Sequence, residues 1–214
     1  MKYKAALFDM NGVLINDEPL HEKSIQETLS TIGLTVTPIE YRKYFLGKVD
    51  EVGFGDFLNA KNRNENIRLL VDFKQRQYMS IADDKAVQTF SGVRRFIQYL
   101  SDKGIKLAVV TSAQSGEATS RLSSIGVAHL FNVVISSADI TNSKPSPEGY
   151  LLVATKLKVT PSECFIIEDT PSGVAAGKAA GSFVLAVTNT VGQHDLKGAD
   201  MIVDGLSTKL IDQL

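Results

Sequence analysis

The sequence predicts an α/β protein in which a parallel sheet carries helices on both faces and an α-helical subdomain is inserted after the first strand. Two observations predict this fold. Short apolar runs alternate with helix-like segments over most of the chain, and one long stretch of helical pattern contains no strand-like run. Regular alternation of strand and helix indicates parallel strands joined by crossover helices.

The strands are expected where apolar residues run almost without interruption, because strands buried on both faces show that pattern. The runs are AALF (5–8), KLAVV (106–110), NVVIS (132–136), CFII (164–167), FVLAV (183–187) and MIV (201–203). Helices are expected between them, at 92–103, 114–125, 147–157 and 171–180. We therefore expect a discontinuous, Rossmann-like core made of residues 1–15 and 90–214.

Residues 16–89 form the predicted insert, an α-helical cap subdomain. DEPLHEKSIQETLSTIG and ENIRLLVDFKQRQYMSIADD read as helices that are polar on one face, and no strand-like run separates them. We expect this small subdomain to lie over the edge of the sheet.

The composition of the 214 residues is that of an ordinary globular protein, with 43% hydrophobic and 22% charged residues. Lys plus Arg (23) nearly balances Asp plus Glu (24), which argues against nucleic acid or a membrane as a partner. The single cysteine, Cys164, lies in an apolar run and fits a reducing compartment. We expect a cytoplasmic protein that is a monomer or a small homo-oligomer.

Polar side chains gather just after four of the predicted strands, where open parallel sheets bind ligands. Asp9 and Asn11 follow the first strand, Thr111 and Ser112 follow the second, Lys144 follows the third and the pair Glu168 and Asp169 follows the fourth. Taken singly, each could be a turn, a helix cap or a solvated charge. Their joint placement on one sheet edge favours a site.

That set suits phosphoryl transfer. A carboxylate such as Asp9 can attack phosphorus if it is held in line, and Lys144 can offset the charge of the phosphoryl oxygens. Asp169, with Glu168, would join Asp9 in holding a hard divalent cation, expected to be Mg²⁺. The expected partner is a small phosphorylated metabolite.

The order of these motifs resembles the haloacid dehalogenase superfamily of phosphohydrolases, in the branch with a helical cap after the first motif. FDMNGVLINDEPLH resembles the first motif, VVTSA the second, SKPSPEGY the third and IIEDTPSGVAAGKAAG the fourth. The resemblance spans nearly the whole chain. It is strongest to the group that contains beta-phosphoglucomutase and small sugar-phosphate phosphatases.

By this resemblance Asp9 would be the nucleophile that forms an aspartyl-phosphate. Thr111 would hydrogen-bond the phosphoryl group near the Ser112 amide, and Lys144 would hold the nucleophile and the phosphate. Glu168 and Asp169 would serve the Mg²⁺ site, together with Asp9 and the backbone carbonyl of Asn11. In the cap, His21 and Lys48 would contact substrate, and LGKVDEVGFGDFL would be a substrate-reading loop.

Asn11 stands where the family pattern has a second aspartate, which protonates the leaving oxygen and then activates water. An amide can do neither, and loss of general acid–base help typically costs about 10²–10⁴-fold in rate. Three explanations stay open. Asn11 is an engineered replacement, or it is natural in a weak or substrate-restricted enzyme, or the protein is a binding module that retains the pocket.

The sequence thus predicts a Mg²⁺-dependent phosphohydrolase of small phosphorylated metabolites, expected to be sugar phosphates, with activity impaired by Asn11. Four alternatives remain. They are a beta-phosphoglucomutase-like mutase, a non-catalytic protein that binds a phosphometabolite, a phosphonoacetaldehyde hydrolase-like enzyme with Lys48 as a Schiff base, and a dehalogenase. The acidic pair Glu168 and Asp169 speaks against the last, because dehalogenases work without Mg²⁺.

Overall fold

The computed structural model describes residues 2–46, 48–82, 88–113 and 115–213, and it divides into two compact units. One unit, Met1–Asn16 with Val87–Leu214, contains the sheet, and we call it the sheet unit. The other, Asp17–Ala86, is helical, and we call it the helical insertion. No helix within the described ranges has the length and apolar character needed to cross a membrane.

The sheet unit is built on a six-stranded sheet in the order β5-β4-β1-β6-β7-β8, with every neighbouring pair parallel. The strands are β1 (Ala5–Phe8), β4 (Lys106–Val110), β5 (Val133–Ile135), β6 (Cys164–Glu168), β7 (Phe183–Val187) and β8 (Met201–Val203). A separate antiparallel pair, β2 (Ile15–Asn16) and β3 (Gln88–Thr89), lies where the chain leaves and re-enters this unit. The predicted α/β class with a parallel sheet is confirmed.

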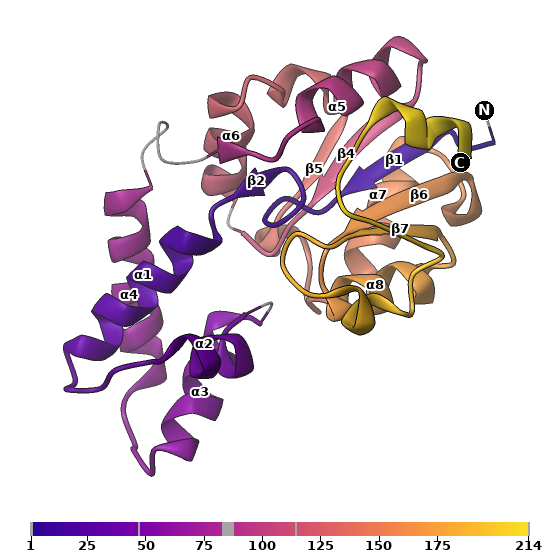
Figure 1. Cartoon of the computed structure of the whole chain (residues 1–214). Helices are drawn as coiled ribbons and strands as arrows, with labels where there is room; N and C mark the ends of the chain where they lie inside the picture. Colours follow the sequence, from indigo (N-terminus) through magenta and orange to yellow (C-terminus); the bar gives the residue numbers. More distant parts are fainter. Residues whose placement is uncertain (1, 47, 83–87, 114, 214) are drawn as a thin grey trace. The chain divides into compact units, whose positions relative to one another are not determined.

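Helices cover both faces of the sheet (Figure 1). They are α5 (Val93–Asp102), α6 (Ser115–Ser124), α7 (Glu148–Leu157) and α8 (Pro171–Ala180). On one face, Leu7 of β1 and Ile166 of β6 pack in a core with Tyr150 of α7. On the other face Phe8 meets Phe96 of α5 edge to face, with ring centroids 6.3 Å apart. Strand residues thus alternate between two buried faces, which explains why their sequence reads as an unbroken apolar run.

The start of α8 shows how the sequence fixes a helix terminus next to the sheet edge. Thr170 has extended backbone and its hydroxyl accepts a hydrogen bond of 3.2 Å from the Gly173 amide, while Pro171 occupies the first helical turn. Helix α7 begins at Glu148, one residue later than predicted, and the Ser146 hydroxyl accepts from the Glu148 amide over 3.3 Å.

The helical insertion contains α1 (Glu18–Ser30), α2 (Pro38–Tyr44), α3 (Asp50–Ala60) and α4 (Ile67–Ile81). Its own core includes Leu29, Phe54, Phe57 and Leu70, so it buries apolar surface independently of the sheet. The predicted helical character is confirmed, but α2 and α3 fill the stretch between the two helices that the sequence indicated. A capping box at the start of α2, in which Thr37 and Glu40 bond each other's backbone amides, stabilises the first of these extra helices.

Candidate active site

The site lies at the carboxyl ends of three adjacent parallel strands. Asp9 directly follows β1, Thr111 directly follows β4, and Glu168 is the last residue of β6. Because β4, β1 and β6 are neighbours in the sheet, these side chains share one edge. The chain then turns sharply after Asp9, with the amides of Leu14 and Ile15 both donating to the Met10 carbonyl, at 2.8 and 3.1 Å.

Lys144 joins two of these carboxylates. Its ammonium donates to Asp9 Oδ1, lies 2.6 Å from Glu168 Oε1, and donates to the Val110 carbonyl over 3.2 Å. Burial acts to lower the pKa of Lys144, yet the charges of Asp9 and Glu168 raise that pKa well above its ordinary value. Lys144 is therefore a fixed positive charge beside the Asp9 carboxylate, as the sequence predicted.

Glu168 is fully buried and has a partner at each carboxylate oxygen. Besides Lys144, Oε1 accepts a hydrogen bond of 2.6 Å from the Tyr150 hydroxyl, while Oε2 accepts from the Asp169 amide at 3.2 Å and the Thr170 hydroxyl at 3.4 Å. These bonds hold the carboxylate that orients Lys144. Tyr150 is the last residue of the SKPSPEGY motif, but no role was predicted for it, because a tyrosine inside a helix usually indicates core packing.

Three carboxylates can supply ligands for one cation. Ligand oxygens of Asp9, Glu168 and Asp169 all lie within 4.8 Å of one another. Asp169 is 2% exposed, and its Oδ1 has no hydrogen-bond partner among the described residues. Burial, followed by the charges of Asp9 and Glu168, raises the pKa of Asp169 well above its ordinary value. A buried, unsatisfied oxygen in a cluster of carboxylates fits a hard divalent ion such as Mg²⁺.

The remaining residues predicted in this edge lie around the same carboxylates. Thr111 is buried, and its hydroxyl oxygen accepts a hydrogen bond of 3.1 Å from the Ala113 amide, which leaves the hydroxyl proton for a ligand. Thr111, the exposed Ser112 and Lys144 line one small pocket. Asn11 is partly exposed and forms a bridge with Ile15. The sheet unit thus brings Thr111, Ser112 and Lys144 together around one pocket, and the roles predicted for them and for Asn11 stay predictions.

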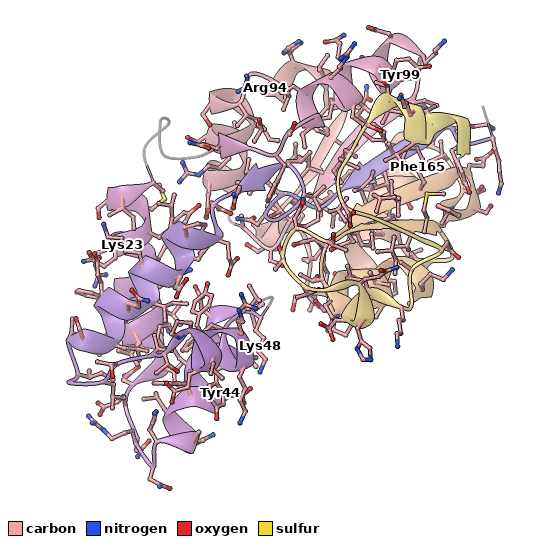
Figure 2. The ribbon with its side chains drawn as sticks, in the orientation of Figure 1. Lys23, Tyr44, Lys48, Arg94, Tyr99 and Phe165 are labelled. Atoms are coloured by element: carbon pink, nitrogen blue, oxygen red, sulfur yellow. The ribbon has the colours of Figure 1, made fainter. Side chains whose placement is uncertain are left out.

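His21 and Lys48 belong to the helical insertion, and their contact with substrate stays a prediction. Lys48 projects from the segment between α2 and α3 (Figure 2), where its ammonium pairs with Asp56 Oδ2 at 2.8 Å. Most of the expected substrate-reading loop is helix α3, and Gly47 lies outside the described residues. The expected loop is therefore limited to the few residues before Asp50.

His21 is held by three neighbours that sequence reasoning missed. Its Nδ1 lies 2.9 Å from the Lys74 ammonium, its Nε2 lies 3.3 Å from Asp17 Oδ2, and its ring stacks on Tyr78 with centroids 4.3 Å apart. Tyr78 in turn donates a hydrogen bond of 2.6 Å to Asp17 Oδ2. His21 is part of a polar network inside the insertion rather than a solvated surface residue.

Fold and site together define a phosphohydrolase-type α/β core with a helical insertion after its first strand. The chain belongs to the haloacid dehalogenase-like hydrolase family, whose model matches residues 6–187. The predicted family is confirmed.

Several proteins similar to this chain are named as phosphatases or mutases of phosphorylated sugars or related compounds. It is 30% identical to validoxylamine A 7'-phosphate phosphatase of Streptomyces hygroscopicus subsp. limoneus, over 96% of this chain and 95% of that protein. It is 32% identical to a phosphorylated carbohydrates phosphatase of Thermotoga maritima, over 83% of this chain and 82% of that protein. Its fold matches a crystal structure of beta-phosphoglucomutase from Clostridium difficile with a TM-score of 0.83 and 22% sequence identity. The match covers 99% of this chain and 96% of that chain.

Proposed function

We propose that this protein is a Mg²⁺-dependent phosphatase of small phosphorylated sugars that works through an aspartyl-phosphate on Asp9. One observation carries the proposal. The Lys144 ammonium contacts both Asp9 and Glu168 at the carboxyl ends of β1 and β6, next to the buried, unsatisfied oxygen of Asp169. The phosphatases among its relatives support the substrate class.

In this proposal Asp9 attacks the phosphorus of the bound monoester, the bond between phosphorus and the sugar oxygen breaks, and that oxygen takes its proton from solvent. A water molecule then cleaves the aspartyl-phosphate, releases phosphate and loses its proton to solvent. Lys144 holds the attacking carboxylate in place and balances the negative charge of the phosphoryl oxygens. The Thr111 hydroxyl donates to a phosphoryl oxygen from the same pocket. Asp9, Asp169, Glu168 and the Asn11 carbonyl would hold Mg²⁺, which would supply further charge neutralisation at the phosphate.

Asn11 sets the limit on this activity. The leaving sugar oxygen needs a proton, and the water that cleaves the aspartyl-phosphate must lose one, but an amide side chain handles neither at neutral pH. Acyl phosphates and other substrates with good leaving groups need less protonation, so they should suffer least. Asn11 keeps the shape of aspartate, so metal and phosphate binding should persist.

The proposal is tested by phosphate release from a panel of sugar phosphates and acyl phosphates with Mg²⁺, for the unmodified chain, Asn11→Asp and Asp9→Asn. We expect Asn11→Asp to raise turnover of ordinary sugar phosphates at least about tenfold, in line with general acid–base catalysis. Asp9→Asn should abolish turnover of every substrate. Equal turnover of the unmodified chain and Asn11→Asp would contradict the role given to position 11.

The same panel separates the alternatives. Conversion of a sugar phosphate into an isomer without phosphate release, followed by NMR, would indicate a mutase. Saturable binding without turnover in both the unmodified chain and Asn11→Asp would indicate a binding module. A Schiff base on Lys48 requires a neutral amine in a shielded site, whereas Lys48 lies in a solvent-accessible ion pair with Asp56. Borohydride trapping with a phosphonoaldehyde tests that chemistry directly.

A further inference from the structure

The turn that follows β7 carries two polar side chains that neither the motifs nor the proposed mechanism uses. It is anchored to the end of β8, because the Thr188 amide donates to the Val203 carbonyl at 3.0 Å and the Thr188 hydroxyl donates to Asp204 at 3.1 Å. The next two residues, Asn189 and Thr190, are half-buried. Thr190 contacts the acidic cluster, and Asn189 contacts the loop that follows Asp9.

Thr190 acts on one oxygen of Asp169. Its hydroxyl donates to Asp169 Oδ2, while Asp169 Oδ1 is buried and has no hydrogen-bond partner among the residues that the structure describes. The hydroxyl therefore fixes the rotation of the carboxylate and leaves the other oxygen available to a cation. A hydrogen-bonded ligand of this kind is the usual way in which proteins orient a metal-binding carboxylate.

Asn189 acts on the loop that follows Asp9. Its side-chain amide donates a hydrogen bond of 2.7 Å to the Gly12 carbonyl. Gly12 has φ +76°, and a Cβ on it would lie 1.8 Å from Asp169 Oδ2 and 2.5 Å from Thr190 Oγ1. The Asn11–Gly12 peptide is therefore pressed against the Asp169–Thr190 pair, and only glycine permits this approach.

We propose that Asn189 and Thr190 are positioning residues for the cation site. Thr190 aims one oxygen of Asp169 at the cation, and Asn189 holds the Gly12 carbonyl, in the peptide that follows the Asn11 carbonyl expected as a ligand. This inference rests on the proposed function, because it assigns the two residues to the cation of the same site.

The test is Mg²⁺ titration by calorimetry of the full chain, which needs no turnover. Thr190→Val keeps the shape and removes the hydroxyl, and Thr190→Ser restores it. We expect Thr190→Val to weaken Mg²⁺ binding about 10- to 100-fold, as losses of such supporting bonds do, and Thr190→Ser to stay within about threefold of the unmodified chain. Asn189→Leu should weaken binding in the same direction. Asp169→Asn removes one carboxylate of the cation site and is the control in which Mg²⁺ binding should be lost.

Circular dichroism establishes that each variant is folded before titration. If Thr190→Val is too unstable to titrate, Thr190→Ala replaces it, because alanine is too small to overpack the turn. The same weakening of Mg²⁺ binding is then expected for Thr190→Ala. Unchanged affinity in a folded Thr190→Val or Thr190→Ala, and in Asn189→Leu, overturns the inference and leaves the proposed function standing. No Mg²⁺ binding by the unmodified chain overturns the cation site itself. Weakened binding that serine rescues supports the inference even if no substrate is found.

Discussion

The ammonium of Lys74 lies 2.9 Å from Nδ1 of His21, and this contact fixes the state of the imidazole. A lysine ammonium has only hydrogens to donate, so Nδ1 must accept and the ring proton sits on Nε2. That proton points at Asp17 Oδ2, 3.3 Å away. His21 is thus held as one tautomer with one ring orientation inside the helical insertion.

Replacing Lys74 by methionine should destabilise the helical insertion. Lys74 is 3% exposed and also pairs with Asp50 at 2.9 Å, so its loss strands a partly buried carboxylate. We expect Lys74→Met to lower the free energy of unfolding by about 1–3 kcal/mol. This is less than the loss for a fully buried ion pair, because Asp50 is partly exposed. Urea denaturation followed by circular dichroism measures it.

Lys23 provides the matched control for this change. It is an exposed lysine on α1 (Figure 2), and Lys23→Met should change the free energy of unfolding by less than about 0.5 kcal/mol. Equal effects of Lys23→Met and Lys74→Met would show that the network around His21 contributes nothing to stability.

Two glutamates of the helical insertion should give opposite pH dependences. Burial raises the pKa of Glu18 above its ordinary value of 4.5, although Tyr41 donates a hydrogen bond of 2.5 Å to it. Hydrogen bonds from Lys61 and from Thr37 lower the pKa of Glu40 to about 2. The first carboxyl is easier to protonate in the folded protein, and the second is harder.

The signs follow from proton linkage. The destabilising effect of Glu18 is absent below pH 4.5 and grows as the pH rises through its folded pKa, so Glu18→Gln should stabilise the protein at pH 7. The stabilising effect of Glu40 is present above pH 4.5 and is lost as the pH falls toward 2, so Glu40→Gln should destabilise it at pH 7. The test measures the melting temperatures of both variants and of the unmodified chain between about pH 3 and 8, at about one measurement per pH unit. Shifts of the same sign at pH 7 would contradict the assignment.

Gly173 is required by the site rather than by the helix. A Cβ at this position would lie 1.9–2.1 Å from the carboxylate atoms of Glu168, whereas a Cβ on Gly116, in the first turn of α6, would meet nothing within 4 Å. Gly173→Ala must displace a buried charged group, and we expect it to cost about 1–3 kcal/mol and to lower turnover. Gly116→Ala should stabilise the protein by up to about 0.5 kcal/mol. Thermal melts of both variants measure the contrast, and a neutral Gly173→Ala would contradict it.

The sequence predicted the sheet closely because buried parallel strands have an unmistakable pattern. All six apolar runs became strands with ends within one residue of those expected. The helical insertion was harder to predict, since α2 is only seven residues long and its main signal is the local capping box of Thr37 and Glu40. Short amphipathic helices bury few residues, so their periodicity is weak.

Site residues that follow a strand were predictable, whereas those that approach from elsewhere were not. Asp9 and Glu168 are placed by strand register alone. The contact of Asn189 with Gly12 joins residues 177 positions apart, and that of Lys74 with His21 joins residues 53 apart. Such contacts depend on loop paths and helix packing, which a single sequence does not encode in any local pattern.

Metal removal should destabilise the unmodified chain and leave an Asp169→Asn variant unaffected. Without a cation, the buried Asp169 carboxyl lies beside Asp9 and Glu168, and its raised pKa means that unfolding becomes easier as the pH rises above 3.8. A neutral amide removes that repulsion. We therefore expect the metal-free Asp169→Asn variant to melt at a higher temperature than the metal-free unmodified chain at pH 7.

Adding Mg²⁺ at about 100 times its dissociation constant should stabilise the unmodified chain by about 2.7 kcal/mol and should leave Asp169→Asn unchanged. Asp200 is the control, because Lys178 Nζ at 2.6 Å and the Val184 amide at 2.8 Å lower the pKa of its carboxyl against the effect of partial burial. Asp200→Asn should therefore destabilise the protein at pH 7 and keep the full response to Mg²⁺. If Asp169→Asn and Asp200→Asn shift the metal-free melting temperature in the same direction, Asp169 does not carry the buried, repelled charge on which the cation site depends.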